Sequence, residues 1–242
     1  MRLALVYGRL QVVELVRFPG FSVATLGFPT LLFVLFGLPR VDGHANVLLA
    51  SYAAFSVLGV GFFQFGVSTA IERVTTWHTF VRILPAPAAS RFAGRTLAAF
   101  VFAALSAATV IIVALATTSA SLTATEWLRL VAALVIGAVP FVLLGLAIAY
   151  WTSPRTALPV ANVLYMLLSY AGGLWTGPGD LPHAVRAISS YAPTRQWGDI
   201  LWPTVSGEPW RVGHWLALVA YAAGFAAIAA WGYRRDEGQR FR

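Results

Sequence analysis

Side chains that could act as nucleophiles, bases or metal ligands are few in this chain and do not gather. Its 242 residues include no cysteine and only four histidines, and these histidines stand far apart in the sequence. No H-E-x-x-H motif and no serine within a G-x-S-x-G turn is present, which disfavours a zinc protease and a serine hydrolase. The sequence therefore predicts that the chain is not an enzyme and binds no metal.

Phosphate chemistry is restricted in the same way. All 17 basic residues are arginines, so the lysine-containing motif G-x-x-x-x-G-K-[ST] cannot occur and ATP hydrolysis by that route is excluded. The arginines are spread singly through apolar sequence rather than along one basic face, so no nucleic-acid partner is expected. No cofactor is predicted for the chain itself.

The acidic residues stay out of the long apolar runs. Ion-driven carriers generally need a carboxylate or a similar polar group near the middle of the membrane. All nine acidic residues instead fall in connections, at a terminus or at the ends of apolar runs. An ion-coupled carrier is therefore disfavoured, but it stays open because unwound backbone carbonyls can also bind sodium.

The composition is that of a membrane protein. Hydrophobic residues make up 59% of the chain and charged residues only 11%, whereas charged residues are about 25% of soluble domains. Crossing the hydrocarbon takes about 20 apolar residues in a helix. We predict an all-α polytopic membrane protein, a single transmembrane domain with six transmembrane helices over roughly residues 21–38, 46–71, 96–117, 127–150, 156–175 and 212–233.

Three segments outside these spans have features of their own. Residues 1–17 have helix-compatible spacing and stop before Phe18-Pro19-Gly20, which predicts an N-terminal interfacial helix. Residues 176–211 contain several prolines and glycines, and we expect an outer re-entrant segment, a broken helical hairpin before the last span. Residues 72–95 join the second and third spans.

Arginines set the orientation. Twelve fall on one side of the predicted spans and five on the other, and the richer side is normally the cytosolic one. Both termini and residues 72–95 are therefore expected in the cytoplasm. We expect a multi-pass protein of the inner membrane of a bacterium.

The 72–95 segment combines charge with a short apolar face. A solvated connector would not need tryptophan, phenylalanine and leucine among its charges, whereas a surface helix that docks a partner protein would. We favour the docking interpretation, and its residues are Glu72, Arg73, Trp77, Phe80, Arg82, Leu84, Pro85 and Arg91.

Two helical stripes carry polar and aromatic side chains within predicted spans. Such side chains should face inward, because in lipid they would lose water without gaining partners. Ordinary helix packing explains them most simply, and lining of a substrate path is the alternative. The residues are Tyr52, Ser56 and Phe63 on the second span and Asn162, Tyr165 and Ser169 on the fifth.

The 72–95 segment also resembles a known motif. It is similar to E-R-x-x-G-T-[LFM]-x-x-L-x-x-x-P, although the usual glycine is absent, and the residues that carry the similarity are Glu72, Arg73, Thr76 (or Thr79), Phe80, Leu84 and Pro85. Leu181-Pro182 and Tyr191-Ala192-Pro193-Thr194 are similar to the signature that follows the fifth span in the same family. The chain thus resembles the membrane subunits of type 2 ATP-binding-cassette (ABC) exporters, the group that includes daunorubicin-type drug exporters.

The resemblance implies a permease that works with other subunits. ATP and Mg would be bound by a separate ABC-type ATPase, which the docking residues would contact. A second permease copy, identical or related, would complete the transporter, with the second and fifth spans lining a path at the dimer interface.

The substrate is the least determined part. An apolar, aromatic-rich interior suits hydrophobic or amphipathic small molecules, which favours drug or antibiotic efflux. Export of a lipid-linked glycan or a lipid is the alternative within the same class. A membrane-embedded scaffold without transport is an alternative from another class.

Overall fold

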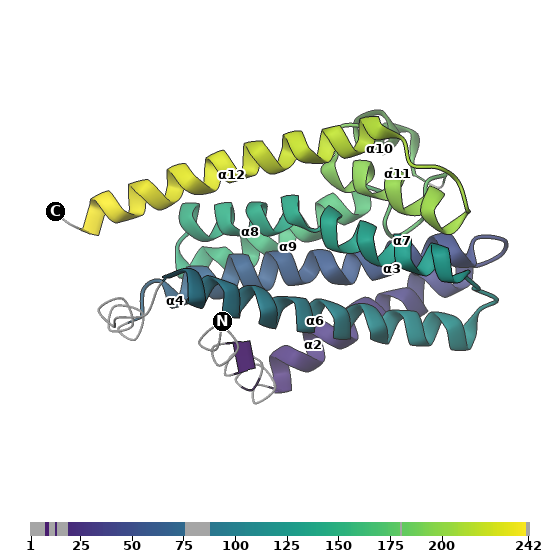
Figure 1. Ribbon diagram of the computed structural model, residues 1–242, viewed down its shortest axis with the longest axis horizontal. Coiled ribbons are helices and arrows are strands. Elements are labelled where there is room, and N and C mark those ends of the chain that lie inside the picture. Colours follow the sequence, from purple (N-terminus) through teal and green to yellow (C-terminus); the bar gives the residue numbers. More distant parts are fainter. Residues whose placement is uncertain (1–7, 10–12, 14–18, 76–87, 180, 241–242) are drawn as a thin grey trace.

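The computed structural model describes residues 8–9, 13, 19–75, 88–179 and 181–240, with the backbone alone at 19–24, 88–92 and 237–240. Every regular element in this part of the chain is helical (Figure 1). The prediction of an all-α polytopic membrane protein is confirmed. The predicted interfacial helix of residues 1–17 lies almost wholly outside the described residues.

The first half of the chain forms three long helical rods. The first is α2 (Pro19–Leu32), continued by a π-helical turn η1 (Phe33–Gly37) and a 3-10 turn η2 (Leu38–Arg40). The second is α3 (Ala45–Val60), a π-helical stretch η3 (Gly61–Val67) and α4 (Ser68–Glu72). The third is α6 (Ala88–Thr117), which begins before the predicted start of the third span at residue 96, so residues 88–95 of the 72–95 segment are continuous with this helix.

The second half contains the remaining helices. The chain continues through α7 (Ala124–Gly137), α8 (Val139–Trp151) and α9 (Pro154–Ala171). The predicted broken hairpin is present as α10 (His183–Ser189) and α11 (Pro193–Val205), and the chain ends with α12 (Val212–Arg240).

Helix starts in this half have identifiable causes. Thr123 and Glu126 form a reciprocal capping box at the start of α7, and Ser153 and Thr156 form another at the start of α9. A capping box satisfies two backbone N–H groups that the first turn leaves unpaired. The caps explain why both helices begin two or three residues before the predicted starts of their spans, at 127 and 156.

Four helical stretches are long and apolar enough to cross a membrane: Ala45–Glu72, Ala93–Thr117, Ala124–Trp151 and Val212–Asp236. They correspond to the predicted second, third, fourth and sixth spans. The first predicted span appears as a shorter apolar helix over Thr25–Arg40, and the fifth as the 18-residue α9. That these two also cross the membrane stays a prediction.

The central element is α3. In the most apolar 18-residue stretch of the second span, 78% of the residues are buried, whereas in that of α12 only 11% are buried. Figure 1 shows α3 in the middle of the bundle, with α2 and α6 on one side and α8, α9 and α12 on the other. The second span therefore forms the core of the single chain.

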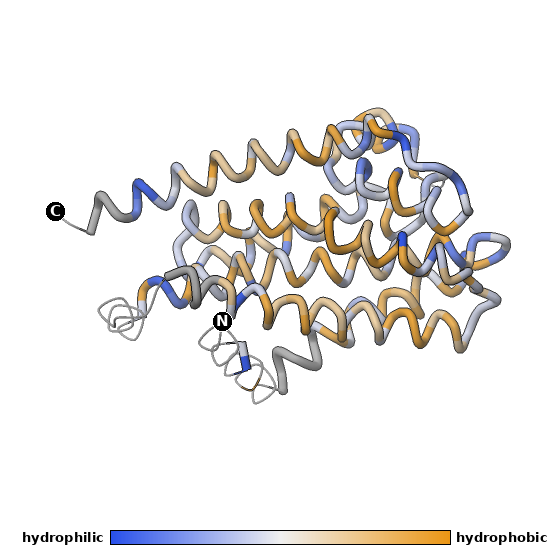
Figure 2. The backbone as a smooth tube through the Cα atoms, viewed as in Figure 1, coloured by the Kyte–Doolittle hydropathy of each residue, from blue (hydrophilic) through white to orange (hydrophobic). Residues whose placement is uncertain are grey.

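The helices run side by side, and their connections alternate between the two ends of the bundle (Figure 1). The loops 41–44 and 118–123 lie at one end with α10 and α11, and the ends of α4, α8 and α12 lie at the other. Hydrophilic residues gather at these two ends, and apolar residues cover the helices between them (Figure 2). The segments that were predicted to lie on the outer side of the membrane are thus found at the same end of the bundle (Figure 1).

Two tryptophans anchor the α10–α11 hairpin. Trp197 is fully buried, and its Nε1–H donates to the carbonyl oxygen of Ala133 at 2.9 Å. The Nε1–H of Trp202 donates to the Ser51 hydroxyl at 2.8 Å. A buried indole that keeps its hydrogen bond combines a large apolar surface with a fixed orientation. The hairpin is therefore packed on α7 and α3 rather than being a free loop.

Candidate substrate pocket and coupling face

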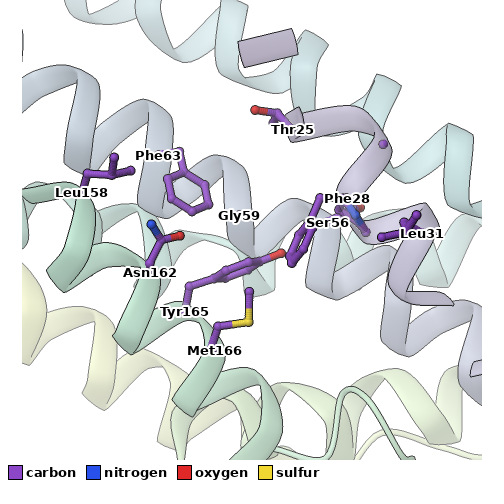
Figure 3. Close-up of a pocket in the computed structure, with 12 residues that line it drawn as sticks. Thr25, Phe28, Leu31, Ser56, Gly59, Phe63, Leu158, Asn162, Tyr165 and Met166 are labelled. Carbon is purple, nitrogen blue, oxygen red and sulfur yellow. The ribbon is translucent and has the colours of Figure 1, made fainter. Parts of the chain in front are cut away.

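A pocket of about 570 Å³ lies between α2, α3–η3 and α9. Figure 3 shows it as an apolar space closed on one side by α9 and on the other by α2. Its lining residues are Thr25, Gly27, Phe28, Pro29, Leu31, Ser56, Gly59, Phe63, Leu158, Asn162, Tyr165 and Met166. None of them is charged.

Four of the six residues predicted for a substrate path line this pocket: Ser56, Phe63, Asn162 and Tyr165. The other two are packed elsewhere. The hydroxyl of Tyr52 donates to the carbonyl oxygen of Trp175 at 3.0 Å, and the hydroxyl of Ser169 donates to the Tyr165 carbonyl within α9. Two stripes far apart in the sequence therefore meet at one pocket, where Ser56 is buried and Asn162 is exposed.

Tyr165 forms a fixed wall of the pocket. It is 2% exposed, and its hydroxyl donates to the carbonyl oxygen of Phe55 at 3.0 Å. Its ring stacks on that of Phe55 with 4.5 Å between centroids and meets Phe63 edge-on at 5.5 Å. These two ring contacts and the hydrogen bond leave little freedom to the ring. This wall is thus set before any ligand arrives.

The contribution of α2 was not predicted. Thr25, Phe28 and Leu31 line the pocket from this helix, but the run 21–38 contains no polar stripe of the kind seen on the second and fifth spans. Its only local signal is Pro29, which lies inside the helix and removes a backbone donor. Proline within an apolar run is common in membrane helices, so this signal is weak.

Close packing of backbones fixes η3 against α8. A Cβ atom built on Gly145 would lie 2.2 Å from the carbonyl oxygen of Gly61 and 3.2 Å from the Gly66 nitrogen. No residue other than glycine fits such an approach without moving a helix. The position of Phe63, between these two glycines, therefore depends on α8.

At the opposite end from the hairpin, Glu72 and Arg73 bind other parts of the chain. The Oε1 atom of Glu72 accepts from Arg95 at 2.6 Å, which joins the end of α4 to the start of α6. The guanidinium of Arg73 donates to Asp236 Oδ1 at 2.6 Å and to the Thr152 carbonyl oxygen at 2.7 Å. We call Arg73, Thr152 and Asp236 the inner clamp.

The inner clamp is continued by aromatic contacts between α8 and α12. The Nε1–H of Trp151 donates to the Ile228 carbonyl oxygen at 3.0 Å, and its ring meets that of Trp231 with 4.9 Å between centroids. The Arg235 guanidinium lies 5.5 Å from the Trp151 ring centroid. The ends of α4, α8 and α12 are therefore held together, with Arg73 in the middle.

The remaining predicted docking residues are placed only in part. Trp77, Phe80, Arg82, Leu84 and Pro85 lie outside the described residues. Arg91 lies in the first turns of α6, of which only the backbone is described. Their role stays a prediction. Among the described residues, no three histidine or acidic side chains form a group that could hold a metal ion.

The bundle of membrane helices has an uncharged pocket between α2, α3–η3 and α9 and a clamped set of helix ends on one side, an arrangement that fits a membrane permease. The family model described as ABC-2 type transporter matches residues 5–204. The chain belongs to this family, and it is the permease component of an ABC transporter. No curated protein and no solved structure matches it.

Proposed function

We propose that this permease exports hydrophobic or amphipathic small molecules, drugs and antibiotics among them, by alternating access powered by the ATPase subunit. The observation that supports the substrate class most is the pocket between α2, α3–η3 and α9. Its volume of about 570 Å³ is within the range of about 300–1,000 Å³ common for small-molecule sites. Aromatic and aliphatic side chains dominate its lining.

The absence of charge from the lining separates the alternatives. A lipid-linked glycan carries phosphate, and a buried phosphate needs arginine or lysine partners. None of the lining residues supplies one, and none supplies a carboxylate for proton or sodium coupling. Export of uncharged or weakly polar molecules therefore fits this pocket better than export of a lipid-linked glycan or ion-coupled transport.

A second permease copy would close the open side of the pocket. Leu31 and Leu35 on the first rod are 54% and 56% exposed, and Val163 and Leu167 on α9 are 65% and 58% exposed. These side chains lie on the two helices that border the pocket. Because α3 is buried, we place the dimer contact on the first rod and α9, and the second span contributes lining from behind them.

Coupling would run through the end of the bundle that holds the inner clamp. Residues 72–95 connect the central span to α6, and Glu72 and Arg73 tie the base of this segment to α6, α8 and α12. Movement imposed by the ATPase at residues 76–87 would thereby reach several helices together. In this arrangement both termini and the ATPase lie on the cytoplasmic side of a bacterial inner membrane.

Filling the pocket tests the substrate path. Met166 lines the pocket from α9, and Met166→Trp should lower ATP-driven accumulation of a neutral aromatic dye in inverted vesicles by about tenfold, because one bulky ring occupies the space that the dye needs. Val219→Trp is the matched control, since Val219 is 64% exposed on α12 and away from the pocket. Equal transport by both variants would remove the pocket from the path.

A further inference from the structure

The side-chain amide of Asn162 is a polar group of the pocket that the described residues leave without a hydrogen-bond partner. Asn162 lies halfway along α9 and is exposed, and within the described part of the chain its amide makes no hydrogen bond. An amide facing lipid at this depth would be costly, since hydrocarbon offers it neither donor nor acceptor. Polar residues in such positions usually face a cavity or another protein surface.

The neighbours of Asn162 are apolar or already engaged. Figure 3 shows its amide below the Phe63 ring and beside Tyr165. The Tyr165 hydroxyl donates to the Phe55 carbonyl oxygen, and the Ser56 hydroxyl donates to the Ala53 carbonyl oxygen at 2.7 Å. The Asn162 side chain therefore brings two N–H donors and a carbonyl acceptor to the pocket, all of them available to a ligand.

We propose that Asn162 determines the specificity of the pocket by selecting uncharged, mainly apolar molecules that carry a hydroxyl, carbonyl or amide group. This inference rests on the proposed export function. A purely apolar molecule would cover the amide and leave it unpaired, which lowers its binding relative to a molecule that pairs with it. A charged molecule would find no countercharge among the lining residues.

The same observation permits a second arrangement, in which the Asn162 amides of two permease copies bind each other. Amide pairs of this kind join membrane helices. The pocket favours the ligand, because the amide lies among the residues that line it and close to the fixed Tyr165 wall. Oligomeric state and substrate preference distinguish the two arrangements, and both are measured below.

The experiment uses the permease and its ATPase reconstituted in vesicles, with three probes that differ in one group. These are 1-pyrenemethanol, 1-methylpyrene and 1-pyrenemethylamine, which is cationic at pH 7. The measured quantity is the ratio of the ATP-driven transport rates of the alcohol and the methyl compound. Taking the ratio between variant and wild type cancels the partitioning of each probe into lipid.

We expect the wild type to prefer the alcohol over the other two probes. Asn162→Leu should lower the alcohol-to-methyl ratio about fivefold, the size expected for one neutral hydrogen bond. Asn162→Gln, which keeps the amide, should retain most of the preference. Val219→Leu is the matched control, since Val219 is 64% exposed on α12 and does not line the pocket, and this variant should leave the ratio unchanged.

Three results would overturn the inference. An unchanged ratio in Asn162→Leu would show that the amide does not select the substrate, while the export function stood. Loss of co-purification between two differently tagged copies in Asn162→Leu would assign the amide to the interface. A wild-type complex that moves none of the probes would overturn the export function together with the inference.

Discussion

Arg73→Asp is expected to reduce ATP-driven transport to background while the chain still inserts and still binds its ATPase. The side chains of Arg73 and Asp236 are 13% and 17% exposed and lie 2.6 Å apart. Removing one partner of a fully buried ion pair costs about 3–5 kcal/mol, and this pair is largely shielded from solvent. Arg73→Asp also places two carboxylates next to each other. The end of α4 would separate from α12 and α8, so movement at residues 72–95 would no longer reach them.

The charge swap Arg73→Asp with Asp236→Arg separates this effect from direct contact with the ATPase. The swap restores the ion pair but not the hydrogen bond to the Thr152 carbonyl, so we expect partial recovery of transport. Arg234→Glu is the matched control, because Arg234 is an exposed arginine on α12, the helix that carries Asp236. Transport and ATP hydrolysis are measured together in vesicles. A swap as inactive as the single variant would argue that Arg73 acts on the ATPase rather than on α12.

Gly145→Ala is expected to destabilise the permease strongly, because α8 and η3 leave no room between them for an added methyl group. The new Cβ atom would meet the Gly61 carbonyl oxygen at 2.2 Å, and backbone atoms of two packed helices cannot move aside cheaply. Overpacking of this kind costs about 1–3 kcal/mol. The midpoint of thermal unfolding in detergent should fall by about 5 °C.

Gly224→Ala gives the matched control for this result. A Cβ atom at Gly224 meets nothing within 4 Å, and alanine in a helix is more stable than glycine by about 0.5–1 kcal/mol. The midpoint should therefore stay level or rise. A fall of the same size in both variants would mean that the loss reflects helix glycines in general and not the contact between α8 and η3.

The fold could be predicted because its main signals are local. Apolar runs of span length predict helices wherever they occur, and the proline and glycine positions in 176–211 predict a broken hairpin, found as α10 and α11. The observed helix starts differ where side chains act on a few backbone groups. Thr123 and Ser153 cap α7 and α9 in this way, and no hydropathy pattern contains that information.

The candidate site could be predicted only in part, for a physical reason. The expected inward orientation of polar groups on the second and fifth spans pointed to Ser56, which is buried, and to Asn162, which lines the same pocket but is exposed. Apolar lining such as Leu31 carries no such constraint, because a leucine is equally stable against lipid or protein. Contacts of long sequence separation, such as Arg73 with Asp236, depend on how whole helices pack and have no local pattern.

The most direct test of the central claim is to purify the tagged permease from its native membrane in mild detergent and to identify what comes with it. We expect an ABC ATPase subunit in the same complex, with ATP hydrolysis that responds to neutral hydrophobic drugs. A permease that purifies without any ATPase, and that is indifferent to nucleotide, would contradict the account of an ATP-driven exporter.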